Sequence, residues 1–144
     1  MLGLIQRVSE AKVVVDGEAT GEIGPGLLLL LGVQKGDTVA NVPKMVHKVY
    51  HYRVFPDEKG HMNLSLKDTG GGLLIVPQFT IAADTKKGLR PSFSSAAAPE
   101  LAEELFSTFV REAAVLLPVQ TGVFGADMKV SLINDGPVTF MLNT

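Results

Sequence analysis

Short hydrophobic runs separated by Gly, Pro, Asn and Asp recur along most of the chain, which is the pattern of β-strands joined by turns. The predicted strands are 2–8, 12–15, 18–23, 27–33, 53–55, 62–66, 73–76, 78–82, 119–121, 128–133 and 138–142. Asp16-Gly17 has the composition of a two-residue hairpin turn. The run 27–33 is apolar on both alternating faces, which predicts an interior strand covered on both sides.

Two segments show helical spacing instead. From about Asp37 to Tyr52, valines recur on one helical face. Pro43 lies near the start, where proline fits only in a first turn, so we expect either a ragged beginning or Asn41 as the N-cap. Pro99 opens a second helix with leucines and a phenylalanine on one side. The pattern predicts a single α/β domain, 1–144, with a mixed β core and two main helices.

The composition limits the classes of function. The chain has 144 residues, 46% of them hydrophobic and 19% charged, which hints at an apolar surface used for oligomerisation. A net charge of −2 provides no basic field for nucleic acid, so any RNA contact must be local, and no DNA partner is expected. The absence of Cys excludes a thiolate nucleophile and fits a reducing compartment. The longest apolar run is too short to cross a bilayer, so we expect no membrane contact and a cytoplasmic location.

The tail Asn134-Asp135-Gly136-Pro137-Val138-Thr139 interrupts two predicted strands. These residues are strong turn formers, and a tight turn is the simplest interpretation of the segment alone. Pro directly after Gly removes a backbone N–H, and Gly has no Cβ, so another molecule can approach the main chain closely. The tail is therefore predicted to present main-chain carbonyl groups.

A basic cluster occurs in the long loop 84–98. It consists of Lys86, Lys87 and Arg90, and is bracketed by Phe79 and Phe93. Cations for phosphates and aromatic rings for an unstacked base are typical of a site for the end of a single-stranded RNA. Taken alone, the pattern fits a solvated loop beside two core phenylalanines better.

No metal site is predicted. His47 and His51 have the i, i+4 spacing of a zinc-binding pair, but Lys48 stands where the glutamate of such a motif is expected. No third ligand is evident, so a surface or interface role is favoured for both histidines.

Gln78-Phe79-Thr80, the loop 84–93 and the tail 134–139 together resemble the D-aminoacyl-tRNA deacylases, the D-tyrosyl-tRNA deacylase family. The likeness covers the whole chain in order and extends to Ile5-Gln6-Arg7-Val8, Gly24-Pro25-Gly26, Met62-Asn63-Leu64-Ser65, Thr121-Gly122 and Phe124-Gly125-Ala126-Asp127-Met128. The resemblance implies a barrel-like, mostly antiparallel fold. It also implies a homodimeric hydrolase that cleaves the ester between a D-amino acid and the 3′-terminal ribose of tRNA, without metal or organic cofactor.

The resemblance also implies roles for particular residues. Gln78, Phe79 and Thr80 would line the catalytic pocket. Gly136-Pro137, joined by a cis bond, would be the chiral selector that enters the partner subunit's pocket. Arg7 would brace the selector, although a plain surface charge on a strand is the alternative. Lys86, Lys87, Arg90 and Phe93 would bind the tRNA end.

Some points stay open in the sequence. The family's first motif usually has Ser before the Gln, where this chain has Pro77; a harmless proline at a strand end or edge is the simpler explanation, and relaxed chirality the other. Thr80 could be the nucleophile, but no base is evident beside it, so we favour main-chain N–H groups as an oxyanion hole with help from the tRNA ribose hydroxyl. A non-catalytic module that binds the tRNA 3′ end, and a purely structural dimerisation protein, are the alternatives.

Overall fold

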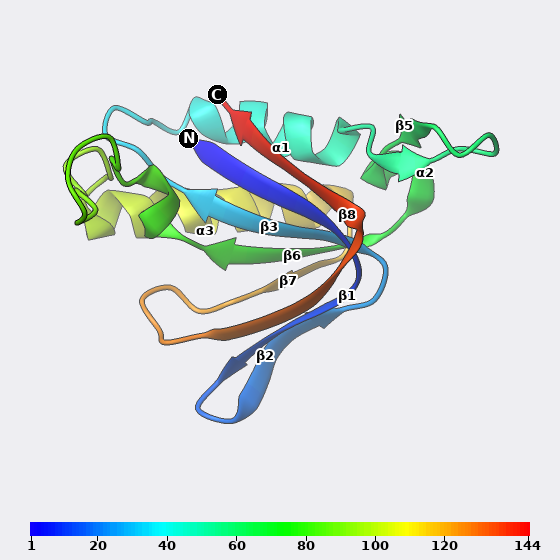
Figure 1. Ribbon diagram of the computed structural model, residues 1–144, viewed down its shortest axis with the longest axis horizontal. Coiled ribbons are helices and arrows are strands. Elements are labelled where there is room, and N and C mark those ends of the chain that lie inside the picture. The colour runs from blue at the N-terminus through cyan, green and yellow to red at the C-terminus, as the bar shows by residue number, and fades with distance from the viewer.

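The computed structural model describes residues 1–144, and its centre is one curled six-stranded sheet (Figure 1). The strands are β1 (Leu2–Val15), β2 (Glu18–Ile23), β3 (Gly26–Gly32), β6 (Gly72–Pro77), β7 (Val119–Thr121) and β8 (Lys129–Asn143). They lie in the order β2-β1-β3-β6-β7, and β8 pairs with β1. Only the β3–β6 and β6–β7 pairs are parallel, so the expected mixed, mostly antiparallel core is confirmed.

The length of β1 makes the sheet curl. Its first half pairs with β3 from Leu2 to Val8, and its second half pairs with β2 from Ala11 to Val15. The hydroxyl of Thr20 in β2 donates to the carbonyl of Thr121 in β7 at 3.3 Å. Because β2 and β7 stand at opposite ends of the strand order, this contact nearly closes the sheet into a barrel.

Two long helices, α1 (Asn41–His51) and α3 (Pro99–Leu116), pack against the sheet, and α2 (Leu66–Thr69) is a single turn beside them (Figure 1). The helices bury one face each in the larger hydrophobic core, to which they contribute Val42, Met45, Val49, Leu105, Phe106 and Phe109. The two main helices are therefore confirmed. None of the helices combines the length and the apolar character that crossing a bilayer requires.

Strand β3 is covered on both sides, as its continuous apolar run predicts. Leu27, Leu29 and Leu31 belong to the core under the helices, whereas Leu28 belongs to a second, smaller core with Leu74. Successive side chains of a strand point to opposite faces, so this division follows directly from the alternation. The central strands thus form a fixed floor between the helices and the barrel interior.

The start of α1 has no side-chain cap, which contradicts the alternative of Asn41 as the N-cap. The helix begins at Asn41 itself, after Ala40, and Pro43 fits within its first turn. The Asn41 side chain does not cap the helix but accepts a hydrogen bond from the Thr38 N–H at 2.9 Å. The expected N-cap was therefore wrong, because the asparagine closes the preceding turn instead.

Three predicted strands, 53–55, 62–66 and 78–82, were also wrong in type or extent. Residues 78–82 form a turn of 3-10 helix, η1 (Phe79–Ala82), because β6 ends at Pro77 and the Ala83 N–H bonds to the Thr80 carbonyl at 3.1 Å. In the small second sheet, β4 (Phe55–Pro56) pairs with β5 (Met62–Leu64). The strand β5 stops there because Ser65 caps α2.

Candidate functional site

The Gly136-Pro137 segment lies within a single strand and not in a turn between two strands. Strand β8 runs continuously from Lys129 to Asn143 along β1. Its register passes from Thr139 opposite Gln6 to Asn134 opposite Val8, so residues 135–138 stand against Arg7 alone. A bulge of this size pushes the extra residues out of the sheet while pairing continues on both sides. We call residues 135–138 the selector bulge.

The selector bulge is closed by the side chain of Asn134. Its Oδ1 accepts the Val138 N–H at 3.1 Å, and its Nδ2 donates to the Thr139 Oγ1 at 2.8 Å. Within the bulge, the Gly136–Pro137 peptide is cis, and Gly136 has φ +127°, a conformation that favours glycine. The backbone of the bulge is exposed while its two ends are fixed.

Arg7 fixes the inner side of the selector bulge. Its Nε donates to the Asp135 carbonyl at 3.1 Å, and its Nη1 donates to the Val54 carbonyl at 2.7 Å. A Cβ added to Gly136 would lie 3.0 Å from Arg7 Nη2 and 2.8 Å from Val138 Cγ2. Arg7 therefore packs directly against the glycine, which the interpretation as a plain surface charge does not account for.

The Val54 carbonyl is itself supported by the β4–β5 hairpin. Next to it, Arg53 Nε donates to the Asn63 carbonyl at 3.0 Å, and Arg53 Nη2 contacts Asn63 Oδ1. Asn63 Nδ2 in turn donates to Asp57 Oδ2 at 3.2 Å. These contacts hold the chain on both sides of Val54, so the hairpin is part of the support for Arg7.

The second motif lies at the carboxyl end of β6. The Gln78 N–H donates to the Leu31 carbonyl at 2.8 Å, which continues the pairing of β6 with β3 by one residue. The Gln78 Nε2 donates to the Thr80 Oγ1 at 2.5 Å. The partner of the threonine hydroxyl is thus an amide and not a base, as the sequence indicated.

A pocket of about 260 Å³ adjoins this motif. It is lined by Pro77, Phe79, Ala97, Pro99, Ala102, Phe124 and Gly125. Sequence reasoning about the site missed the alanines and Phe124, which carry no chemistry of their own; Phe124-Gly125 had stood out only in the resemblance. The Ala97 N–H bonds to the Val33 carbonyl at 3.0 Å beside β3, Ala102 lies on α3, and the Phe124 ring lies 6.3 Å from that of Phe106. Pro77 faces this pocket at the last position of β6, beyond the residues that pair with β7.

The basic loop forms one rim of the same region. Asp84 and Ser92 exchange two backbone hydrogen bonds of 2.8 and 3.0 Å, which close the loop, and Lys86, Lys87 and Arg90 are exposed between them. The rings of Phe79 and Phe93 lie 5.1 Å apart and are 57% and 43% exposed. The interpretation of these two rings as core residues is therefore wrong, since they form an exposed aromatic pair.

The selector bulge and the carboxyl end of β6, which carries the pocket residue Pro77, lie far apart within one chain. Arg7 pairs with Leu27, which pairs with Leu73 near the start of β6, whereas Pro77 is at its end. Four residues of strand span about 13 Å, and the bulge is also separated from β6 by two intervening strands. One copy of the chain therefore does not bring its own selector bulge to its own pocket.

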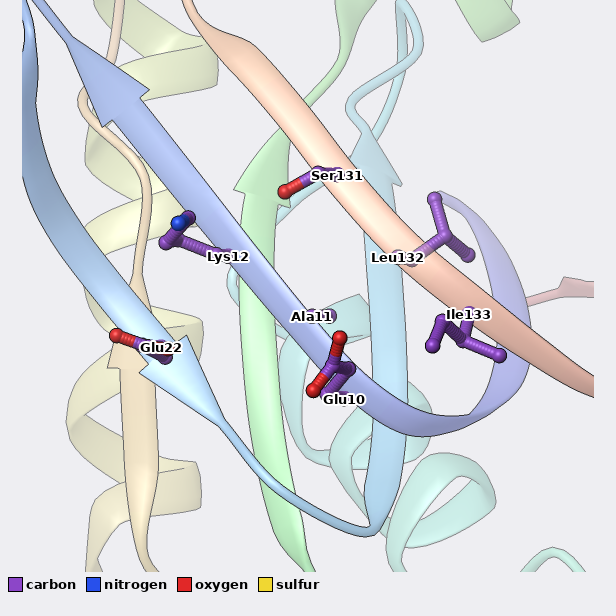
Figure 2. A pocket seen from close by; sticks show the side chains of 7 residues that line it. All are labelled: Glu10, Ala11, Lys12, Glu22, Ser131, Leu132 and Ile133. Atoms are coloured by element: carbon purple, nitrogen blue, oxygen red, sulfur yellow. The ribbon is translucent and has the colours of Figure 1, made fainter.

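The other main hollows of the chain contain none of the site residues named from the sequence. A cavity of about 150 Å³ lies on β1, β2 and β8, and Figure 2 shows its lining residues: Glu10, Ala11, Lys12, Glu22, Ser131, Leu132 and Ile133. The rings of His47 and His51 lie 4.3 Å apart on α1. Nowhere in the chain do three or more His, Asp or Glu side chains come together as a metal-binding group.

Comparison with known proteins decides the family. A family model described as "D-Tyr-tRNA(Tyr) deacylase" matches residues 4–143. The chain belongs to this deacylase family. Two relatives named D-aminoacyl-tRNA deacylase, from Marinobacter nauticus and Aeromonas hydrophila, are 63% and 61% identical; they cover 100% and 99% of this chain, and the matches span 94% and 99% of their own lengths.

Solved structures agree with the deacylase fold. A structure titled c-Myc DNA Unwinding Element Binding Protein has a TM-score of 0.95 at 38% identity, covering 100% of this chain and 99% of its own. A structure titled as that of a probable eukaryotic D-amino acid tRNA deacylase has a TM-score of 0.82 at 17% identity, covering 98% and 97%, and supports the fold alone. The resemblance to the deacylase family and its barrel-like fold is confirmed.

Proposed function

We propose that the chain hydrolyses the ester bond of D-aminoacyl-tRNA, releasing the free D-amino acid and tRNA. Membership of the deacylase family makes it an enzyme, a hydrolase acting on aminoacyl-tRNA. The observation that carries the finer proposal is the selector bulge, a side-chain-poor piece of main chain that Arg7 holds in place. We place the enzyme in the cytoplasm, and the proposed chemistry uses neither a metal nor an organic cofactor.

The active form we propose is a homodimer in which the selector bulge of one subunit enters the pocket of the other. The separation of the two motifs within one chain supports this arrangement, because each would be incomplete alone. Strand β8 pairs only with β1, so its outer edge is unpaired over a long stretch. It exposes Ile133, Phe140 and Met141, and an apolar edge strand of this length is a natural surface for association.

Chirality would be read by steric exclusion. An L-amino acid places its side chain where a D-amino acid has only its α-hydrogen. A rigid main-chain wall at Gly136-Pro137 rejects the L side chain by clash, while its carbonyl groups accept hydrogen bonds from the substrate ammonium. Such a filter does not distinguish among D side chains, and it passes glycine. Glycyl-tRNA is therefore expected to be a substrate as well.

The ester carbonyl would be polarised by main-chain N–H groups at the start of η1. The Gln78 N–H is already used by the Leu31 carbonyl, so it is not part of this group. The first N–H groups of a helical turn have no partner inside that turn, which leaves those of Phe79 and Thr80 as donors. An oxyanion hole of two donors supports water attack, assisted by the neighbouring ribose hydroxyl of the tRNA.

Deacylation of D-Tyr-tRNA, L-Tyr-tRNA and Gly-tRNA by the purified protein tests the proposal. We expect hydrolysis of the D and glycyl esters and protection of the L ester. Binding of D-Tyr-tRNA without hydrolysis would favour the non-catalytic module instead. Hydrolysis of the L ester would point to relaxed chirality, and a Pro77→Ser variant that restores protection would assign that effect to Pro77.

Thr80→Ala separates the two chemical routes. We expect near-normal single-turnover rates, because the hydroxyl is hydrogen-bonded to an amide and has no base beside it. Gln78→Ala serves as a control for loss of the same hydrogen bond. A fall of several orders of magnitude in the single-turnover rate of Thr80→Ala, with tRNA binding unchanged, would make the threonine the nucleophile.

A further inference from the structure

The charged side chains of α1 are all cationic, which is unusual in a chain with a net negative charge. The helix contains no acidic residue, and it exposes Lys44, His47 and Lys48 on consecutive turns, with His51 half-buried at its end. Its opposite face is buried in the core, so these side chains all lie on the solvent side. Residues at i and i+4 of a helix are neighbours on its surface, so Lys44 and Lys48 form a pair of adjacent cations.

The basic face of α1 continues toward the proposed catalytic pocket. Lys35 is exposed in the turn that precedes the helix, and its N–H donates to the Ser95 carbonyl at 3.0 Å. Gln34 pairs with Ala96, next to the pocket residue Ala97. A cation thus stands between the rim of the pocket and the start of α1. We call Lys35, Lys44 and Lys48 the basic track.

Nearby acidic groups offset little of this charge at the start of the track. Asp37 is buried and bonded to the amino terminus at 2.7 Å, so its charge is already paired. Glu112 of α3 shares a second hollow with His47, His51 and Lys67. Beside Lys44, His47 and Lys48 lies an open hollow of about 690 Å³, whose remaining lining includes Asn143 and Thr144. The Lys48 Nζ donates to the Asn143 carbonyl at 2.6 Å, which fixes that ammonium group beside the end of β8 at the rim of the hollow.

We propose that the basic track binds the phosphates of the double-stranded acceptor stem while the 3′ end occupies the pocket. This inference rests on the proposed deacylase function and adds a second RNA contact outside the catalytic site. Double-stranded RNA is recognised mostly by shape and by contacts to its phosphates and 2′-hydroxyls. A short row of lysines on a convex helix suits a backbone of phosphates and carries no base specificity.

The test compares two double variants with the same change of charge. Lys44→Ala/Lys48→Ala removes two cations of the track, and Lys59→Ala/Lys67→Ala removes two exposed lysines from elsewhere in the chain. For D-Tyr-tRNA we expect the first variant to raise KM about tenfold and to reduce the slope of log affinity against log salt by about two, one per phosphate contact. The control variant should behave as wild type.

A substrate without a stem distinguishes binding from damage to the pocket. With the D-tyrosyl ester of adenosine, the difference between the track variant and wild type should disappear. Equal loss on both substrates, or equal salt slopes for the two double variants on tRNA, would overturn the proposal. Should wild type hydrolyse neither substrate, the deacylase function fails by itself, and the salt slope for binding of uncharged tRNA still decides for or against the track. If the track variant bound tRNA as tightly as wild type but bound an acidic protein less tightly, the track would belong to that other partner and the proposal would be wrong.

Discussion

The selector bulge and the rim of the pocket are built in opposite ways. The bulge is tied by side chains, with Arg7 bonded to the Val54 and Asp135 carbonyls and Asn134 bonded to Val138 and Thr139. The rim presents exposed aromatic rings and cations on a loop that backbone bonds close only at its base. A steric filter must not move, whereas a surface that receives a flexible RNA end can adapt. The difference in support therefore matches the two tasks proposed for them.

Gly136→Ala should give the largest loss of function. The new Cβ would lie within 3.0 Å of Arg7 and Val138, and φ +127° is unfavourable for any residue with a side chain, so we expect a cost of about 1–3 kcal/mol in the free energy of unfolding. A displaced selector should lower the kcat/KM for D-Tyr-tRNA about 100-fold. Gly24→Ala is the matched control, because a Cβ there meets nothing within 4 Å. Full activity of Gly136→Ala would contradict a tight wall.

Arg7→Lys should come second. Lysine keeps the charge but lacks the guanidinium fork that reaches two carbonyl groups at once, so we expect a loss of about 1.5–3 kcal/mol in unfolding free energy. The more telling measurement is the ratio of D-Tyr-tRNA to L-Tyr-tRNA hydrolysis, which should fall as the bulge loosens. When Arg7→Lys is combined with Gly136→Ala, the loss of unfolding free energy should be smaller than the sum of the two single losses, because both changes disturb the same contact between Arg7 and Gly136. An unchanged ratio would show that Arg7 stabilises the fold without bracing the selector.

Phe79→Ala tests the opposite side of the comparison. We expect KM for D-Tyr-tRNA to rise about tenfold, since stacking of one base on an aromatic ring contributes about 1–3 kcal/mol. The ring is exposed, so the unfolding free energy should change by less than about 0.5 kcal/mol. Phe79→Tyr keeps the aromatic face and should retain the wild-type KM. If Phe79→Ala destabilises the protein as a core phenylalanine would, the rim is not an adaptable surface.

Much of the fold could be predicted from the sequence because local patterns decide it. The apolar run of β3 predicted its burial on both faces, and Pro99 marked the start of α3. The selector bulge was less predictable, because turn-forming residues favour both a hairpin and a bulge, and only pairing with β1 on both sides decides between them. Gln78-Phe79-Thr80 has strand-forming residues, but the parallel strand ends at Pro77 and the chain turns. Ala97 reaches the pocket through long-range pairing with Val33, and Ala102 through the packing of α3, which residue types alone do not reveal.

The support behind Arg7 gives the smallest and most specific prediction. Asp68 completes a capping box next to β5, where its Oδ2 accepts the Ser65 N–H at 2.8 Å and the Ser65 hydroxyl at 2.9 Å. The backbone hydrogen bond from Ser65, followed by its side-chain hydrogen bond, lowers the pKa of Asp68 below its usual 3.8.

A lowered pKa in the folded state means that the carboxylate stabilises the protein above about pH 4, and that this contribution is lost as the pH falls through the folded pKa. Asp68→Asn should therefore be slightly less stable than wild type at pH 7 in urea unfolding, and the difference should shrink as the pH falls below about 4. The capping box only anchors the hairpin that holds Val54, so the D-to-L hydrolysis ratio of Asp68→Asn should stay near that of wild type. A fall in this ratio as large as that of Arg7→Lys would show that α2 also helps to hold the selector bulge in place.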